Sequence, residues 1–261
     1  MFLADPPRTQ YDWYFSLLGI PIRVHPLFWA VGMLVGFQGV PSGKPVYLLV
    51  WIAVFFVSIL VHEMGHALMM RYYGWNPSVT LYAMGGFARY DSGFQPNHSS
   101  YQRPGNREFA QIIIAAAGPA AGFLLAGATL LISGMMGNLP QFSVGLPTFI
   151  SWDVPVPITE ENLFHWYLVD CLLFINIYWG LVNLIPVYPL DGGQIARELF
   201  MKYGGGDGIQ QSLWLSVWVG GAMAAYGVMH GTLYFGLLFG YMAFSSYQML
   251  KSFGGFGRNP W

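Results

Sequence analysis

Two histidines and a glutamate stand close together inside a long apolar stretch of the chain. His62, Glu63 and His66 lie within residues 46–74, which read VYLLVWIAVFFVSILVHEMGHALMMRYYG. In a helix, residues four apart share a face, so His62 and His66 can offer two imidazoles to one metal ion while Glu63 lies beside them. The alternative is a pair of core histidines and a buried acid held by neighbouring groups. We favour a functional centre, because ionisable groups are costly inside a membrane span.

A candidate third ligand follows a later apolar stretch. Residues 183–193 read NLIPVYPLDGG. Two prolines end a helix there and two glycines permit a sharp turn, so Asp191 can be aimed back between helices. A carboxylate on such a turn is suited to complete a metal site with the two imidazoles. The alternative is that Asp191 caps a helix that begins near Gln194.

The composition is typical of a membrane protein. Of the 261 residues, 55% are hydrophobic and only 9% are charged, whereas about a quarter of a soluble domain is charged. The net charge of −1 argues against nucleic-acid binding, which needs a basic surface. Because Cys171 is the only cysteine, an intramolecular disulfide and a cysteine-rich zinc site are excluded. Metal ligands must therefore be histidines and carboxylates.

Membrane-spanning helices must position these residues, because about 20 apolar residues cross the hydrocarbon core. The sequence predicts an all-α polytopic membrane protein that forms a single domain over residues 1–261. Residues 1–20 are aromatic and polar, show no signal peptide and are expected to lie at the membrane interface. The C-terminal helical pair occupies residues 211–251. About six spans are predicted, at residues 24–40, 46–74, 109–136, 163–187, 213–229 and 232–250.

One segment after the second span is expected to form strands. Side chains alternate in type from Val79 to Met84, and Gly85 and Gly86 can make a two-residue turn into a second strand that ends at Tyr90. We expect a membrane-associated β-hairpin beside the helix that carries the histidines. The alternative is an ordinary surface hairpin.

The cations fall on one side of the six-span arrangement, with Lys44 alone on the other. The positive-inside rule makes the first side cytoplasmic, with both termini inside a cell membrane. His62, His66 and Asp191 then all lie toward the cytoplasmic ends of their helices. The cations on the cytoplasmic side are Arg8, Arg23, Arg71, Arg89, Arg103, Arg107, Arg197, Lys202, Lys251 and Arg258.

The chain resembles the site-2 protease family of intramembrane zinc metalloproteases. The resemblance spans residues 22–193 and lies in three motifs that follow one another along the predicted helices. The motifs are His62-Glu63-x-x-His66, the zinc-peptidase pattern, then Gly118-x-x-x-Gly122, then Asn183-x-x-Pro186-x-x-x-Leu190-Asp191-Gly192.

The resemblance implies a role for each motif. His62, His66 and Asp191 would bind one zinc ion per chain, and Glu63 would be the catalytic base. Asn183 would help to hold the substrate. The expected partners are transmembrane protein substrates in a lipid bilayer.

The resemblance also implies that the hairpin with Gly85 and Gly86 meets the substrate. One position departs from the pattern, because Gly122 stands where many members carry asparagine. Many relatives carry a PDZ or CBS module, and this chain is expected to be a minimal catalytic core without either.

The same residues support a hydrolytic mechanism. A metal ion with three protein ligands keeps a position for water, and Glu63 beside it can take the proton of that water. A divalent-cation transporter would instead need ionisable groups across the bilayer. A non-catalytic zinc-binding scaffold would be expected to lack Glu63 or a ligand. His25, His165 and Asp170 are expected to be structural or hydrated, with His165 and Asp170 able to pair.

Overall fold

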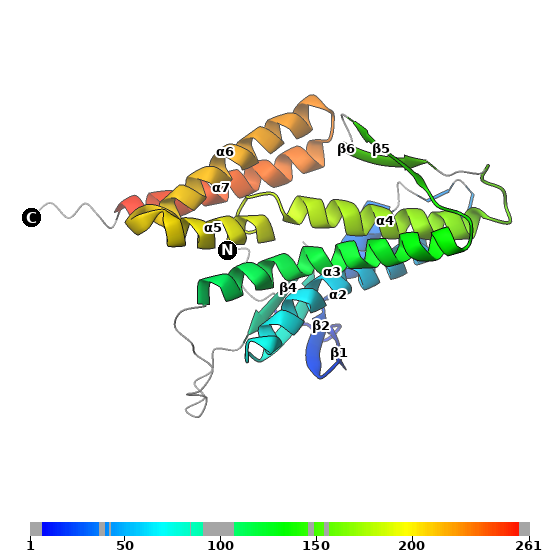
Figure 1. Cartoon of the computed structure of the whole chain (residues 1–261), viewed down its shortest axis with the longest axis horizontal. Coiled ribbons are helices and arrows are strands. Elements are labelled where there is room, and N and C mark those ends of the chain that lie inside the picture. Colours follow the sequence, from blue (N-terminus) through cyan, green and yellow to red (C-terminus); the bar gives the residue numbers. More distant parts are fainter. Residues whose placement is uncertain are drawn as a thin grey trace, which may run out of the picture. The chain divides into compact units, whose positions relative to one another are not determined.

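The computed structural model describes residues 7–36, 40–41, 43–83, 85–90, 107–145, 149–153 and 157–255. These residues are mostly helical and also hold two small β-sheets (Figure 1). The chain divides into two compact units, one of Met1–Ser92 with Gly118–Gly180 and one of Gly93–Ala117 with Leu181–Trp261. Arg103 and Arg258, two of the cations used to orient the chain, lie outside the described residues.

The helices follow the predicted apolar stretches closely. α2 begins one residue after Val46 and ends two residues before Gly74. The helices are α1 (Pro26–Gly36), α2 (Tyr47–Tyr72), α3 (Arg107–Met135), α4 (Leu163–Asn183), α5 (Asp191–Tyr203), α6 (Gly208–Met229) and α7 (Leu233–Gly255), with a short 3-10 helix at Gly205–Asp207.

Four helical segments among the described residues are long and apolar enough to cross a membrane. They are Tyr47–Tyr72, Phe109–Met135, Leu163–Asn183 and Gly205–Met229. The predicted span at 24–40 is represented by α1, whose 11 residues cover roughly 16 Å, about half of the hydrocarbon core. The predicted span at 232–250 lies in α7, which is not among these four.

The first sheet holds more strands than the sequence predicts. Its order is β1 (Trp13–Leu17), β2 (Ile20–Val24), β3 (Pro77–Tyr82) and β4 (Gly85–Tyr90). β1 lies in residues 1–20, the segment expected at the membrane interface, and forms a hairpin with β2, which begins at the end of that segment. β2 then pairs in parallel with β3, as in the register of Ile22 with Val79. This pairing joins residues far apart in the chain, so local patterning gives no sign of it.

The predicted hairpin forms, but its turn lies elsewhere. Gly85 and Gly86 are the first residues of β4, where they pair with Tyr82 and Leu81 of β3. The prediction that they make the turn is therefore wrong. Gly85 does have a positive φ of 107°, a conformation that favours glycine, and both glycines lie against large side chains of the first unit, as described below.

α2 is the central helix of the first unit. It packs against α1, β3 and β4, and its buried residues share one core with Ile20, Ile22 and Val24 of β2. The Phe28 ring of α1 stacks on Phe55 of α2 with centroids 5.0 Å apart. α2 is therefore held along its length by apolar contacts before it reaches its histidines.

Two features lie away from α2. In the first unit, β5 (Gln141–Gly145) and β6 (Phe149–Asp153) form an antiparallel hairpin between α3 and α4 in the chain. In the second unit, α6 and α7 lie side by side as an antiparallel pair (Figure 1). They turn at His230 and Gly231, where Gly231 has a φ of 73°, so the predicted C-terminal helical pair forms.

Candidate metal centre and active site

The two histidines of α2 converge on one point. Their Nε2 atoms are 3.2 Å apart, and the rings stand at 77° with centroids 4.9 Å apart. His62 is 3% exposed and His66 is 7% exposed. The helical spacing of four residues thus produces the shared face that the sequence predicts.

This separation fits a metal ion. Zinc binds imidazole nitrogen at about 2.0–2.1 Å in tetrahedral geometry, which places two nitrogen ligands about 3.3 Å apart. The observed 3.2 Å between the Nε2 atoms agrees with that value. The pair could therefore hold zinc with little movement of either ring.

Gly118 of α3 makes room for His66. A Cβ atom at Gly118 would collide with Nε2, Cε1 and Cδ2 of the His66 ring. The ring therefore lies directly against the α3 backbone, and an alanine at this position would displace it. The sequence singled out Gly118 as a helix-packing residue, and the structure adds that the group it accommodates is a predicted metal ligand.

Glu63 lies against the second strand of the hairpin. A Cβ atom at Gly86 would stand 2.6 Å from Cγ and 2.9 Å from Oε1 of Glu63. Glu63 is 3% exposed, so its carboxylate is enclosed next to the His62 and His66 pair on one side of α2. The backbone of β4 thus passes the predicted catalytic base at contact distance, which only glycine permits.

Trp179 of α4 is a neighbour of the site that sequence reasoning does not select. Its ring lies at 77° to the His62 ring with centroids 6.5 Å apart. A Cβ atom at Gly85 would collide with the same indole. Trp179 therefore fills the space between the start of β4 and the metal-ligand face of α2, a position that no local sequence signal indicates.

A buried polar pair lies one turn before His62. The Asn176 amide of α4 donates to Ser58 Oγ at 2.9 Å and to its own helix at Leu172 O. A Cβ atom at Gly122 would stand 3.4 Å from the Asn176 carbonyl and 3.6 Å from Oδ1. The position of Gly122, where the family often carries asparagine, is thus next to an asparagine supplied by α4.

Asp191 is the first residue of α5 and is 7% exposed. Leu190 occupies the N-cap position of this helix, which begins three residues earlier than Gln194. A Cβ atom at Gly192 would stand 2.7 Å from Ile185 O, and one at Gly193 would lie 2.5 Å from Tyr188 N. The two glycines therefore let α5 start directly against the preceding turn.

The predicted ligands form a candidate metal-binding group. Within the described part of the chain, His62, His66 and Asp191 each offer a ligand atom, and these atoms lie within 4.8 Å of one another. Asn183 is also buried, at 9% exposed, and is the last residue of α4, but it is not in this group. Two imidazoles and a carboxylate are a donor set typical of catalytic zinc.

The matches with known proteins agree with this site. The sequence model of peptidase family M50 (Peptidase_M50) matches residues 50–224, which is more than half of the chain. The chain belongs to peptidase family M50. The matched range contains the histidine pair and Asp191.

Curated relatives resemble the chain over most of its length. A putative zinc metalloprotease of Synechocystis sp. is 27% identical over 201 residues, 73% of this chain and 44% of that protein. The stage IV sporulation protein FB of Bacillus subtilis is 28% identical over 184 residues, 70% of this chain and 49% of that protein. The chain thus spans about half the length of the curated relatives it matches.

The fold of this M50 chain also has a solved counterpart. The site-2 protease from Methanocaldococcus jannaschii aligns with a TM-score of 0.55 and 21% identity, over 92% of this chain and 95% of that one. The likeness establishes a common fold, and it covers both the α2 region and the C-terminal helices.

Proposed function

We propose that this chain is an intramembrane zinc metalloprotease, which hydrolyses a peptide bond within or near the transmembrane segment of a membrane-protein substrate. The observation that carries the proposal is the buried His62–Glu63–His66 face of α2, inside a helix long and apolar enough to cross a membrane. Metal ligands and an enclosed carboxylate inside a membrane-spanning helix are energetically costly, so residues of this kind usually have a function. Membership of family M50 agrees with it.

His62, His66 and Asp191 would hold one zinc ion. Bound zinc lowers the pKa of a water molecule toward about 7 and polarises a carbonyl group. Gly118 keeps the His66 ring in place by presenting bare backbone to it. The three protein ligands leave one tetrahedral position for water or for the substrate.

Glu63 would act as the general base. Its carboxylate follows His62 directly in α2 and is enclosed by Gly86 of β4, so it stands beside the ligand atoms without being one of the candidate ligands. It would take a proton from the attacking water and pass it to the departing amide nitrogen. Burial in apolar surroundings makes the position of that carboxylate well defined.

β4 would hold the substrate near Glu63. It is an edge strand of the four-stranded sheet, and an edge strand can pair with an extended peptide. A peptide bond in a transmembrane helix is hydrogen-bonded to its neighbours, so the substrate must unwind locally before attack. Gly85 and Gly86 lie at the end of β4 that contacts Glu63, and we propose that they and Asn183 contact the substrate.

The positive-inside rule places both termini in the cytoplasm and the candidate zinc site near the cytoplasmic face of a cell membrane. His62 lies fifteen residues after Tyr47, the first residue of α2, or roughly 22 Å along the helix. The hydrocarbon core is about 30 Å thick. The cut is therefore expected in the cytoplasmic half of the substrate span.

The proposal is tested with purified protein and a panel of single-span peptides inserted in vesicles in known orientation. Mass spectrometry of the products should locate the cut in the cytoplasmic half. Glu63→Gln keeps the shape of the side chain but cannot take a proton, so turnover should fall by at least about a hundredfold while zinc stays bound. Glu161→Gln, at an exposed acid, is the matched control.

Three outcomes would contradict the proposal. Full activity of Glu63→Gln would remove the general base. Bound zinc without cleavage of any peptide would favour a non-catalytic scaffold. Movement of zinc across the vesicle membrane would favour a cation transporter, the second alternative considered from the sequence.

A further inference from the structure

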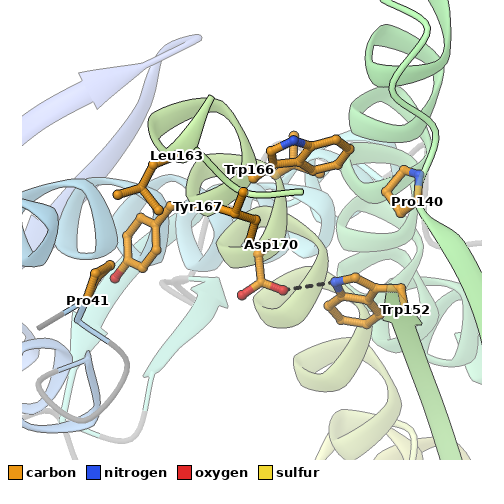
Figure 2. Close-up of a pocket in the computed structure, with 9 residues that line it drawn as sticks. Pro41, Pro140, Trp152, Leu163, Trp166, Tyr167 and Asp170 are labelled. Carbon is orange, nitrogen blue, oxygen red and sulfur yellow. Dashed lines mark hydrogen bonds between the residues drawn. The ribbon is translucent and has the colours of Figure 1, made fainter. Parts of the chain in front are cut away.

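A second site lies in the first half of α4, more than two turns before Trp179. It is a cavity of about 330 Å³ between α4, the β5–β6 hairpin and Pro41. Figure 2 shows its lining residues, with the carboxylate of Asp170 between the rings of Tyr167 and Trp152. None of these residues takes part in the candidate metal centre.

Three of the nine residues that line the cavity are aromatic. Trp152 comes from β6, and Trp166 and Tyr167 come from α4. Pro140 and Leu163 add apolar surface without donors that face a ligand. Aromatic faces of this kind attract cations, because the ring quadrupole places negative charge on the face.

The aromatic walls are held by packing behind them. Trp166 is 3% exposed and belongs to a separate core cluster with Val169 and Leu173. Trp152 packs on Phe142 at 6.0 Å between centroids. The cavity is therefore preformed and does not depend on the arrival of a ligand.

The hairpin that carries Trp152 is attached to α4. The Tyr178 ring lies 6.1 Å from the Trp152 ring, and the Tyr178 hydroxyl donates to Ile150 O on the same strand. Trp152 Nε1 donates to Asp170 Oδ1 at 2.9 Å. These contacts fix the carboxylate as well as the indole.

Among the described residues, Asp170 is the only charged one that lines the cavity. Within the described residues it makes no ion pair. Its hydrogen-bond partner is the Trp152 indole, whereas the sequence suggests a pair with His165. Lys44 pairs with Glu160 instead. The cavity therefore holds a carboxylate that no ion pair of the described residues neutralises.

A buried tyrosine completes the lining. Tyr167 is 9% exposed, and its hydroxyl makes no hydrogen bond to an oxygen or nitrogen of the described residues. Its ring is fixed by an edge contact with Tyr47 at 5.0 Å. The hydroxyl hydrogen-bonds the Cys171 thiol, so Tyr167 contributes its ring to the lining.

We propose that this cavity binds an organic ammonium ion, carried either by a lipid headgroup or by a free amine. A cation would pair with the Asp170 carboxylate next to the three lining rings, and its alkyl groups match the apolar remainder of the wall. An anion would be repelled by Asp170, and a purely apolar ligand would leave that carboxylate desolvated. The inference does not rest on the protease activity.

The first test is equilibrium binding of radiolabelled choline to the purified zinc-loaded protein in detergent, at constant ionic strength set with sodium chloride. Binding should be saturable at one site per chain. The neutral isostere 3,3-dimethylbutan-1-ol should compete at least about tenfold more weakly than unlabelled choline, because it lacks the charge.

Variants then place the binding in this cavity. Asp170→Asn retains an oxygen that can accept from Trp152 Nε1 but removes the charge, so choline should bind at least about tenfold more weakly. Asp153→Asn makes the same change in charge at an exposed residue of β6 that does not line the cavity, and it should bind choline like the parent. Zinc content reports that each variant is folded.

A second arm separates the two sources of the ammonium group. The protein is exchanged into vesicles of phosphatidylglycerol that contain phosphatidylcholine or phosphatidylethanolamine, then delipidated, and the retained lipids are identified by mass spectrometry. Retention of an amine lipid by the parent and its loss from Asp170→Asn indicates a lipid headgroup. Choline binding without such retention indicates a free amine.

The proposal is overturned by any of three results. One is the absence of saturable choline binding together with the absence of selective lipid retention. Another is equal binding of choline and its neutral isostere. The third is unchanged binding in Asp170→Asn, which would place the cation elsewhere on the protein.

Discussion

The metal-ligand face of α2 and the aromatic cavity beside α4 both lie in the first unit and bury polar groups in opposite ways. Around His66 and Glu63, two positions lack a side chain, and the backbone of Gly118 and Gly86 reaches the functional groups. Around Asp170, large aromatic side chains stand apart and leave a cavity of about 330 Å³. One site is closed by the absence of Cβ atoms, and the other is held open by rings.

The difference teaches where each site is sensitive to change. A site closed around its own side chains tolerates no added atom, because packed interiors relax little. An open cavity tolerates changes of shape better than changes of charge. The following substitutions separate the two behaviours.

The largest effect is expected from Gly118→Ala. The added methyl group meets the His66 ring, so that ring must rotate away from His62, and bound zinc should fall by roughly a hundredfold, because overpacking against a ring this close costs about 3 kcal/mol, the upper end of the usual range. Metal analysis of the purified variant measures it. Gly127→Ala in the same helix meets nothing within 4 Å and should keep parental zinc. Equal zinc in both variants would separate Gly118 from the metal centre.

A smaller and different effect is expected from Gly86→Ala. Its Cβ would press on Cγ of Glu63 at 2.6 Å, which displaces the base without touching the metal ligands. Turnover should fall by about tenfold or more with zinc content unchanged. Gly221→Ala, which meets nothing within 4 Å, serves as the control. Loss of zinc and activity together would show that β4 supports the ligands and not the base alone.

The smallest effect is expected at the polar pair between the two helices. Ser58→Ala removes the acceptor of the Asn176 amide, and hydrogen bonds between membrane helices contribute about 0.6 kcal/mol on average. Unfolding in mixed micelles should show a loss of about this size, with zinc retained. Ser252→Ala, at an exposed residue near the end of α7, should change nothing. A loss of zinc in Ser58→Ala would mean that the pair positions His62.

Much of the metal centre can be predicted from the sequence, because its signals are local. The spacing of His62 and His66 and the apolar run around them need only helical periodicity. The prolines and glycines beside Asp191 indicate a turn that can direct its carboxylate toward the histidines. These residues form the one candidate metal group of the described chain.

What could not be predicted depends on contacts between distant segments. The parallel pairing of β2 with β3 joins Ile22 to Val79, and nothing near either residue encodes the other. Gly85 and Gly86 were assigned to a turn because glycine is common in turns, but they are needed for close approach of α4 and α2 side chains. Trp179 and Trp152 carry no motif at all.

The measurement that tests the central claim most directly is the zinc content of purified protein with and without His66. The parent should carry close to one zinc per chain, because His62, His66 and Asp191 form one candidate site. His66→Ala should carry much less, while His165→Ala, a histidine of α4 outside the group, should match the parent. Equal zinc in the parent and in His66→Ala would contradict the account.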